Sequence, residues 1–282
     1  MRKNNFSPVR KFYAALKFIS IGFMLISAAS LIAVIFYILY NGADKLSLHL
    51  LFGEYDSERP TLLPALAGTL QLVGIAIVIS VPIGIFSAVF LVEYMGNKGR
   101  LVRIIRVATE TLAGIPSIVY GLFGYLVFVV AFKWGYCMLG GGLTLAVMIL
   151  PLIVRSSEES LLSVPDGYRE GAYALGASKV STIFKIVLPA AASGIVTSVI
   201  LAVGRIISES AVLIVTIGMV VNKVPETLLY PGTSLALDIY YFASHGYPDE
   251  AAATGVVLLV VVMALNLLAS GVGKLIKRRA GE

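Results

Sequence analysis

Long apolar runs alternate with short polar segments along the whole chain. Six runs are about 18 residues or longer, the length that a helix needs to cross a bilayer. They occupy residues 18–40, 67–92, 108–132, 141–158, 190–217 and 252–273. Because polarity does not alternate residue by residue within them, the pattern favours six transmembrane helices over the strands of a membrane β-barrel.

The first run, residues 18–40, follows basic residues, as the core of a signal peptide does. A cleavable signal peptide has an apolar core of about 7–15 residues, and this run is longer. We therefore expect residues 18–40 to stay in the membrane as an anchor.

Composition agrees with the hydrophobic pattern. Hydrophobic residues make up 58% of the 282 residues and charged residues 13%, whereas soluble domains contain about 45–50% apolar and about 25% charged residues. Too few polar side chains remain to cover a surface that faces water. The chain is therefore predicted to be an all-α membrane protein in contact with the lipid bilayer.

Basic residues are distributed unevenly over the polar segments. One set of segments holds Arg2, Lys3, Arg10, Lys11, Lys17, Lys98, Arg100, Arg103, Arg106, Arg169, Lys179, Lys185, Lys274, Lys277, Arg278 and Arg279. The segments on the other side hold Lys45, Arg59, Lys133 and Lys223. Basic residues stay on the cytoplasmic side, and an even number of spans returns the chain to its starting side, so both termini are expected in the cytoplasm. The net charge of +6 then reflects this bias and not nucleic-acid binding.

A small-residue-rich segment, EGAYALGASKVSTIFKIVLP, covers residues 170–189 on the expected cytoplasmic side. Alanines such as Ala172 favour helix, Gly176 permits a sharp change of direction, and Pro189 suits the first turn of a following helix. The spacing predicts two short helices joined by a tight turn at the membrane surface. Such a pair either links two spans or offers a partner protein a close approach.

The same segment resembles the EAA loop of ABC-importer permeases. The matching residues are Glu170, Gly171, Ala172, Gly176, Ile186, Leu188 and Pro189, with Gly171 where the family often has alanine. In that family the loop forms coupling helices that dock into a cleft of a cytoplasmic ATPase subunit. The resemblance implies that residues 165–189 are a coupling loop and that the chain is a transport subunit.

The coupling segment also contains part of a phosphate-binding pattern. Gly171 and Gly176 have the glycine spacing of a P-loop, but Ala177 and Ser178 follow where the P-loop requires Lys and then Ser or Thr. We therefore expect no cofactor in this chain, with ATP and Mg bound by partner ATPase subunits.

No catalytic or metal-binding constellation stands out elsewhere in the sequence. His49 and His245 lie far apart in expected outer segments, and the single Cys137 excludes an intrachain disulfide and a cysteine-based metal cluster. A membrane-embedded enzyme would need a convergent set of catalytic residues. We expect the chain not to be an enzyme.

Ionisable residues interrupt the apolar runs at Glu110, Arg155, Glu158, Arg205 and Glu209. Charges within a membrane cost roughly 2.5–3.5 kcal/mol on insertion scales and mark a transport path or a paired network. Arg155 precedes Glu158 by three residues and Arg205 precedes Glu209 by four, so each pair is expected to share a helical face. Either these pairs only neutralise themselves and join helices, or their guanidinium groups line a polar path for an oxyanion.

Larger parts of the chain resemble the permeases of phosphate importers. These are residues 66–95, ATETLAGIPSIVYGLFG at 108–124, and the segments GGLTLAVMILPLIVRSSEESL and GRIISESA. The similarity covers about residues 66–218, and the regions beside the coupling loop are closer to the PstA type of subunit than to PstC. The resemblance implies a type I ABC-importer permease fold and transport importance for Arg155, Glu158, Arg205 and Glu209.

The resemblance also implies partners. They are a PstC-like permease subunit, two PstB-like ATPase subunits and a PstS-like extracytoplasmic phosphate-binding protein. Such a complex lies in the cytoplasmic membrane of a bacterium or archaeon.

Helix-weakening residues lie in the third run. Gly114 and Pro116 loosen the expected helix, and Pro116 removes one backbone donor. Membrane helices tolerate this where protein or a watery cavity satisfies the freed groups. This part of the chain, together with Glu110, is either a kinked packing helix or a flexible wall of the transport path.

These observations predict the organisation of the chain. Residues 1–65 would hold an N-terminal cytoplasmic segment, the first span and an outer loop, residues 66–275 the permease domain, and residues 276–282 a cytoplasmic tail. The resemblance implies that the chain would form half of a transmembrane path for inorganic phosphate. The alternatives are a permease for another oxyanion, such as sulfate or molybdate, or a secondary transporter. A secondary transporter needs no coupling loop, and the chain lacks the evident internal repeat of many such carriers.

Overall fold

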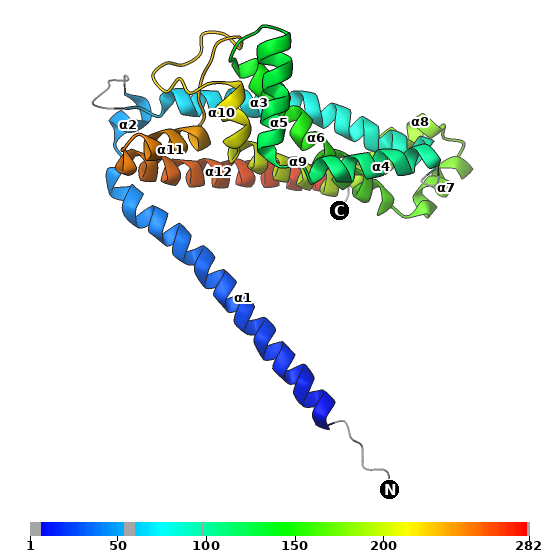
Figure 1. Cartoon of the computed structure of the whole chain (residues 1–282). Coiled ribbons are helices and arrows are strands. Elements are labelled where there is room, and N and C mark those ends of the chain that lie inside the picture. Colours follow the sequence, from blue (N-terminus) through cyan, green and yellow to red (C-terminus); the bar gives the residue numbers. More distant parts are fainter. Residues whose placement is uncertain (1–6, 54–59, 97–98, 281–282) are drawn as a thin grey trace.

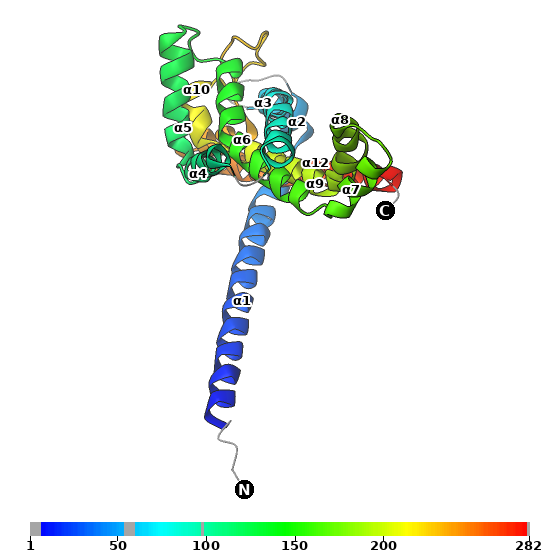
Figure 2. The ribbon, with the colours of Figure 1, turned by 90° about the vertical axis from the view of Figure 1, so that its right-hand side faces the viewer.

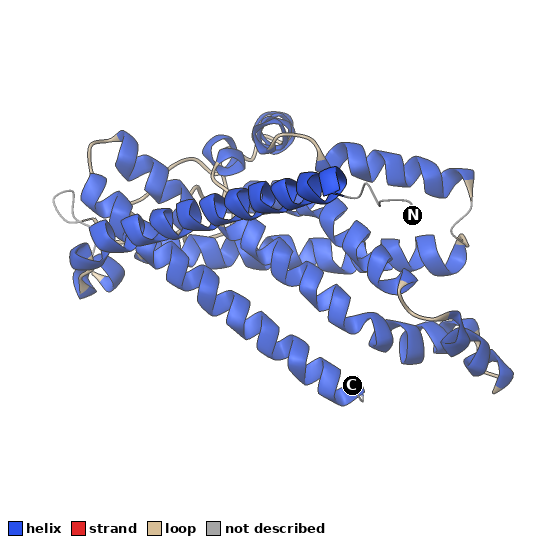
Figure 3. Cartoon of the chain, turned by 90° about the horizontal axis from the view of Figure 1, so that it is seen from below, coloured by secondary structure: helices blue, strands red, loops and turns tan. Residues whose placement is uncertain are grey.

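The computed structural model describes residues 7–53, 60–96 and 99–280 (Figure 1). These ranges contain helices and loops and no strand (Figure 3). The helices are α1 (Ser7–Gly42), α2 (Leu48–Phe52), α3 (Leu63–Val89), α4 (Arg100–Ala113), α5 (Ser117–Gly124), α6 (Met138–Leu162), α7 (Asp166–Ala174), α8 (Lys179–Thr182), α9 (Leu188–Ile207), α10 (Ala211–Thr216), α11 (Leu235–Ser244) and α12 (Pro248–Ala280). A 3₁₀ turn, η1 (Ala43–Lys45), and the π-helical turns η2 (Phe90–Tyr94), η3 (Tyr125–Ala131) and η4 (Ile183–Val187) extend them.

Within the described ranges, five helices are long and apolar enough to cross a membrane, and a bent pair of helices makes a sixth if it counts as one span. The five are Phe12–Lys45, Leu63–Tyr94, Met138–Leu162, Lys179–Ile207 and Pro248–Leu268. The predicted all-α membrane class is confirmed. The cytoplasmic position of both termini stays a prediction.

Some expectations concern residues beyond the described ranges. Arg2, Lys3, Arg59 and Lys98, which contributed to the predicted orientation, lie outside the described residues, as do residues 281 and 282 of the expected tail. Helix α12 continues to Ala280, and the division of the chain at residues 65 and 275 stays a prediction.

The third expected span, residues 108–132, is wrong as a single helix. Helix α4 ends at Ala113, α5 begins at Ser117, and the two helices are bent by 100° relative to each other. In Figure 2, α4 is seen nearly end-on while α5 stands upright. The weakness expected at Gly114 and Pro116 is therefore a complete break, because Pro116 cannot donate the backbone hydrogen bond that would continue the helix.

The fifth expected span, residues 190–217, is displaced toward the N-terminus. One continuous helix runs from Lys179 through α8, η4 and α9 to Ile207. The chain then leaves the helix, and α10 starts separately at Ala211. The apolar run in the sequence thus extends across the break between α9 and α10, and the polarity of its residues gives no sign of that break.

Pro189 lies in the first turn of α9, as expected, but α9 continues α8 and η4 without a break. The π turn η4 directly precedes it, and the Leu188 N–H donates to the Ile183 carbonyl there. This change in hydrogen-bond register accommodates a residue that has no backbone donor.

Helix α6 forms the centre of the bundle and packs against α3 and α9 (Figure 1). Glycines bring α3 and α6 close together: a Cβ atom added at Gly142 would lie 2.6 Å from Ile75, and one at Gly84 would lie 2.6 Å from Ile153. Small residues at helix contacts permit close packing in membranes. The buried core beside these contacts includes Leu72, Ala76, Leu145, Ile149, Ala202, Ile206 and Leu213.

Helix α1 leaves the bundle and extends away from it (Figures 1 and 2). Its most apolar stretch has no buried residue within the chain. The C-terminal end of α1 contacts α12. The approach is close there, because a Cβ atom added at Gly42 would lie 2.4 Å from the Ala252 carbonyl oxygen. Most of α1 therefore takes no part in the packing of the bundle.

Candidate functional site

The expected coupling loop lies at one end of the bundle, where α7 and α8 project beside the last turns of α3 and α6 (Figure 1). Gly176 has φ +79°, in the left-handed region that glycine adopts without steric cost. The Gly176 N–H donates to the Tyr173 carbonyl (2.9 Å) and the Ala177 N–H to the Ala172 carbonyl (3.0 Å). This pair of bonds is a Schellman cap. The predicted tight turn and the short helix before it, α7, are confirmed, whereas the second helix is not short, because α8 is the first part of the continuous helix Lys179–Ile207.

The residues of the EAA-like pattern differ in their exposure in the structure. Glu170, Gly171 and Gly176 are exposed, so they are available to a partner protein. Ala172 is buried. The remaining members, Ile186, Leu188 and Pro189, are partly buried in the continuous helix behind the turn. The surface formed by α7, α8 and the connection 175–178 is called the coupling surface below.

Exposed apolar side chains give the coupling surface its tip. Leu175 is 91% exposed, and Tyr168 and Tyr173 are exposed on α7. The apolar side chain of a leucine at the tip of a turn is exposed to water unless another surface covers it, and such exposure is typical of an interaction site. The sequence prediction missed Leu175, although an apolar residue directly before the turn glycine was a visible signal.

A buried apolar cluster supports the coupling surface from below. It joins the end of α3 to the end of α6 and to the helix after the turn, and consists of Ala88, Val89, Leu161, Val164, Ile183, Val187, Ala191 and Ile195. The coupling surface is therefore built on the membrane helices and is not a loose connection.

A second group of polar residues lies between α4 and α6. It lines a pocket of about 200 Å³ formed by Arg106, Thr109, Glu110, Arg155, Glu158, Glu159 and Leu162. Three carboxylates and two guanidinium groups thus share one site. This set is called the polar cluster below.

Within the polar cluster, the expected pair of Arg155 with Glu158 is wrong. Arg155 Nε donates to Glu159 Oε1 (3.1 Å) one helical turn later, and Arg155 Nη1 lies 3.8 Å from Glu110 Oε1 on α4. Glu158 instead accepts from Arg106 Nε (2.7 Å). Arg106 was missed because its position in the sequence placed it in a cytoplasmic connection.

The expected pair of Arg205 with Glu209 is also wrong. Helix α9 ends at Ile207, so the spacing of four residues no longer places the two side chains on one face. Glu209 Oε1 accepts from the Val212 N–H (3.3 Å) and caps the start of α10. Among the described residues no ion pair joins Arg205 to Glu209, and Arg205 is exposed.

The break between α4 and α5 shapes the wall beside the polar cluster. Glu110 lies on the last turn of α4, just before Gly114 and Pro116. The Tyr120 hydroxyl donates to the Leu112 carbonyl (2.8 Å) across the break, which satisfies one of the carbonyls that a helix end leaves free. The structure thus brings Glu110 to Arg155 but leaves Arg205 apart from both.

The chemistry of the polar cluster is that of exchangeable ion pairs. Arg155 is 58% exposed and its two carboxylate contacts are at the surface. Exposed pairs contribute about 0–1 kcal/mol, so an anion in the pocket can replace a carboxylate at this guanidinium group. Glu158 is buried with a side-chain exposure of 9%, so its pair with Arg106 is less open to exchange than the contacts of Arg155.

Comparisons with known proteins agree with this architecture. A sequence profile of the family described as "Binding-protein-dependent transport system inner membrane component" matches residues 80–282. The chain is 33% identical to the probable ABC transporter permease protein YqgI of Bacillus subtilis, over 90% of this chain and 92% of that protein. It is 37% identical to the phosphate transport system permease protein PstA of Yersinia pestis, over 89% of this chain and 86% of that protein.

A solved structure shows the same fold. The structure of a bacterial alginate ABC transporter in complex with an alginate pentasaccharide-bound periplasmic protein contains a chain that superposes with a TM-score of 0.68. The superposition covers 98% of this chain and 99% of that chain at 16% sequence identity. At this identity the likeness concerns the fold alone.

Proposed function

The chain belongs to the family of binding-protein-dependent transport system inner membrane components, and from this membership we propose that it forms half of the transmembrane path for inorganic phosphate. It is a multi-pass permease subunit of an ABC importer. In such importers ATP is hydrolysed by a separate subunit, so this chain is a transport subunit and not an enzyme.

The similarity to PstA permeases supports phosphate as the substrate. One relative with that name is 37% identical over 89% of this chain, and another, from Haemophilus influenzae, is 34% identical over 83% of it. This identity over most of the chain is the observation that carries the proposal. It agrees with the arginine side chains in the polar cluster, since a guanidinium group matches the geometry of a phosphate oxyanion.

The coupling surface supports an ATP-driven mechanism. The exposed Leu175 and the fixed turn at Gly176 form a rigid projection that fits a cleft on an ATPase subunit. Closure of the two ATPase subunits on ATP would displace this projection and the helices behind it. The path would then alternate between outward-open and inward-open states, because nucleotide and substrate bind the two states with different affinity.

The polar cluster supports a path of low affinity. At Arg155 an arriving anion competes with Glu110 and Glu159, so it is held weakly and can leave. A tight site would retain the phosphate and slow its release. Arg205 lies exposed on α9, where the second permease subunit of the complex would complete the path.

Membership of the family implies other permease, ATPase and binding-protein subunits. For this chain we assign a PstC-like permease, two PstB-like ATPases and a PstS-like extracytoplasmic phosphate-binding protein, in the cytoplasmic membrane of a bacterium or archaeon. The similarity to PstA proteins supports this assignment.

Uptake of radiolabelled phosphate by proteoliposomes that contain the assembled complex tests the substrate. We expect ATP-dependent uptake that a large molar excess of sulfate or molybdate leaves unchanged. Strong competition by sulfate or molybdate, or no phosphate uptake by a complex that hydrolyses ATP, would overturn the assignment.

A further inference from the structure

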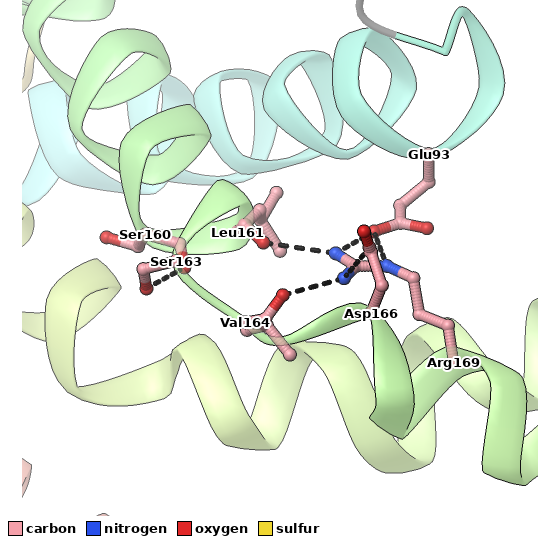
Figure 4. Close-up of polar contacts among 7 residues, drawn as sticks. All are labelled: Glu93, Ser160, Leu161, Ser163, Val164, Asp166 and Arg169. Carbon is pink, nitrogen blue, oxygen red and sulfur yellow. Dashed lines mark hydrogen bonds and ion pairs between the residues drawn. The ribbon is translucent and has the colours of Figure 1, made fainter.

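Arg169, on the coupling helix α7, uses all of its hydrogen-bond donors (Figure 4). Nε and Nη2 donate to Glu93 Oε1 (3.1 and 2.8 Å), Nη2 also donates to the Leu161 carbonyl (3.1 Å), and Nη1 donates to the Val164 carbonyl (2.8 Å) and to Asp166 Oδ1 (3.2 Å). A guanidinium group has five N–H donors, and each of the five has an acceptor here.

These acceptors belong to three parts of the fold. Leu161 lies in the last turn of α6 and Val164 lies two residues after the helix ends, so Arg169 caps the carbonyl end of that helix. Asp166 is in the first turn of α7 itself. Glu93 lies in η2, the last turn of the long helix that begins with α3, and is 76 residues away in the sequence.

The contact between Arg169 and Glu93 is shielded from water. The Arg169 side chain is 14% exposed and the Glu93 side chain 5% exposed. Removing one partner of a buried ion pair leaves an uncompensated charge and costs far more than breaking a surface pair. Separating these two residues is therefore more costly than separating an exposed pair.

A second contact joins the coupling surface to the same turn of η2. Lys179 Nζ, at the start of α8, lies 4.7 Å from the centre of the Tyr94 ring. The buried apolar cluster adds to this contact: Ala88 and Val89 from α3 belong to the same cluster as Ile183 from the helix after the turn. Both coupling helices are thus attached to the end of the helix that α3 begins.

We infer that Arg169 is a positioning residue that fastens α7 to α3 through Glu93, so that a displacement of the coupling surface moves α3 and α6 together. The chain connects α7 covalently to α6 through residues 163–165 and to the helix Lys179–Ile207 through residues 175–178, but not directly to α3. Without the bond to Glu93, α7 has no ion pair to the end of the α3 helix, and its movement reaches α3 only through the Lys179–Tyr94 contact of α8 and through apolar packing. The inference rests on the coupling role assigned above to this surface.

Substitutions in the assembled complex test the fastening. In Glu93→Gln and Arg169→Lys we expect complexes that keep their ATPase subunits and hydrolyse ATP, with about a tenfold fall in phosphate taken up per ATP, within the usual range of coupling energies. Lysine has three donors at one nitrogen and cannot reach acceptors on three elements. Asp166→Asn is the matched control, because the exposed Asp166 contacts the same guanidinium group but not α3; we expect wild-type uptake per ATP.

A distance measurement tests the same link without transport. Spin labels at Gly167→Cys on α7 and Phe86→Cys on α3, both exposed positions, are introduced after Cys137→Ser. We expect one narrow distance distribution that is unchanged by ATP, and a broader one when Glu93→Gln is added. A label distance that changes with ATP in the otherwise wild-type complex would overturn the inference, as would unchanged uptake per ATP in Glu93→Gln.

The two proposals fail in different ways. A wild-type complex that takes up no phosphate contradicts the proposed substrate, but the label pair needs only ATP and still tests the link. If Glu93→Gln does not assemble, the label distance in Arg169→Lys decides the question: a broader distribution supports the link, and an unchanged narrow one overturns it.

Discussion

Glu158 on α6 accepts its hydrogen bond from Arg106 on α4, and not from Arg155 three residues earlier on its own helix (Arg106 Nε to Glu158 Oε1, 2.7 Å). The bond joins residues 52 positions apart and buries the carboxylate to 9% side-chain exposure. It holds the amphipathic helix α4 against the centre of the bundle. Arg155 is thereby left to two exposed carboxylates, and the two arginines of the polar cluster have different roles.

Replacing Arg106 tests its structural role. We expect Arg106→Gln to lower the free energy of unfolding by about 2 kcal/mol, because Glu158 would stay buried without a charged partner. The thermal midpoint of the purified complex measures this loss. The double variant Arg106→Gln with Glu158→Gln should recover part of it, and the exposed Arg103→Gln on the same helix serves as the control. An unchanged midpoint in Arg106→Gln would contradict the role.

Replacing Arg155 tests contact with the anion. Because Arg155 is largely exposed, we expect Arg155→Lys to change stability by less than about 0.5 kcal/mol. Phosphate uptake should nevertheless fall about tenfold, because lysine lacks the planar fork that meets an oxyanion. Glu159→Gln, which removes one competing carboxylate, is expected to assemble normally and to retain uptake. Full uptake by Arg155→Lys would show that the residue does not meet the anion.

The turn at Gly176 allows a matched comparison with Gly167. Both glycines have open space where a Cβ atom would lie, but only Gly176 has a positive φ. We expect Gly176→Ala to cost about 1–2 kcal/mol locally and Gly176→Leu to block docking and uncouple ATP hydrolysis from uptake. Gly167→Ala should be neutral or slightly stabilising. ATPase activity and uptake, measured together, check this; equal behaviour of the two alanine variants would contradict it.

Asp238, on α11 between the fifth and sixth spanning helices, links stability to pH. Burial raises the pKa of Asp238 from 3.8 to about 7, although the hydrogen bond from Thr233 acts in the opposite direction. The folded protein therefore binds this proton more tightly than the unfolded chain does. Stability is greatest below the unfolded value and falls as the pH rises toward about 7.

The variant Asp238→Asn removes this titration. We expect its thermal midpoint to exceed that of the wild type at alkaline pH and to depend less on pH between mildly acidic and alkaline buffers. Asp44→Asn, at an exposed position, is the control and should leave the pH dependence unchanged. A wild-type pH dependence in Asp238→Asn would refute the assignment.

Cysteine labelling tests the orientation of the chain in the membrane. After Cys137→Ser, a reporter at Leu175→Cys should be protected from an impermeant thiol reagent in intact cells and react in inverted vesicles. A reporter at Glu226→Cys, in the exposed part of the connection after α10, should react in intact cells. Reaction of Leu175→Cys from outside would contradict both the orientation and the coupling role.

Several features of this protein follow from the sequence because their causes are local. Apolar runs identify a membrane protein, since transfer into lipid depends on the composition of about 20 successive residues. The turn at Gly176 follows from the conformational freedom of one residue, and the weak point at Pro116 from a missing donor.

The tertiary structure decided the partners of the charged residues. Arg155 and Glu158 have helical spacing, but two acceptors, Glu110 and Glu159, compete for Arg155, and a distant donor, Arg106, approaches Glu158. The spacing of Arg205 and Glu209 does not place them on one helical face, because the helix ends between them.

The same holds for the bond between Arg169 and Glu93. Nothing near Arg169 in the sequence indicates an acceptor 76 residues away. Periodicity shows which face of a helix a side chain occupies, but only the packing of α3, α6 and α7 determines which charge lies opposite it. Ion pairs between helices depend on distances of a few ångströms across that packing, and the one-dimensional pattern does not contain those distances.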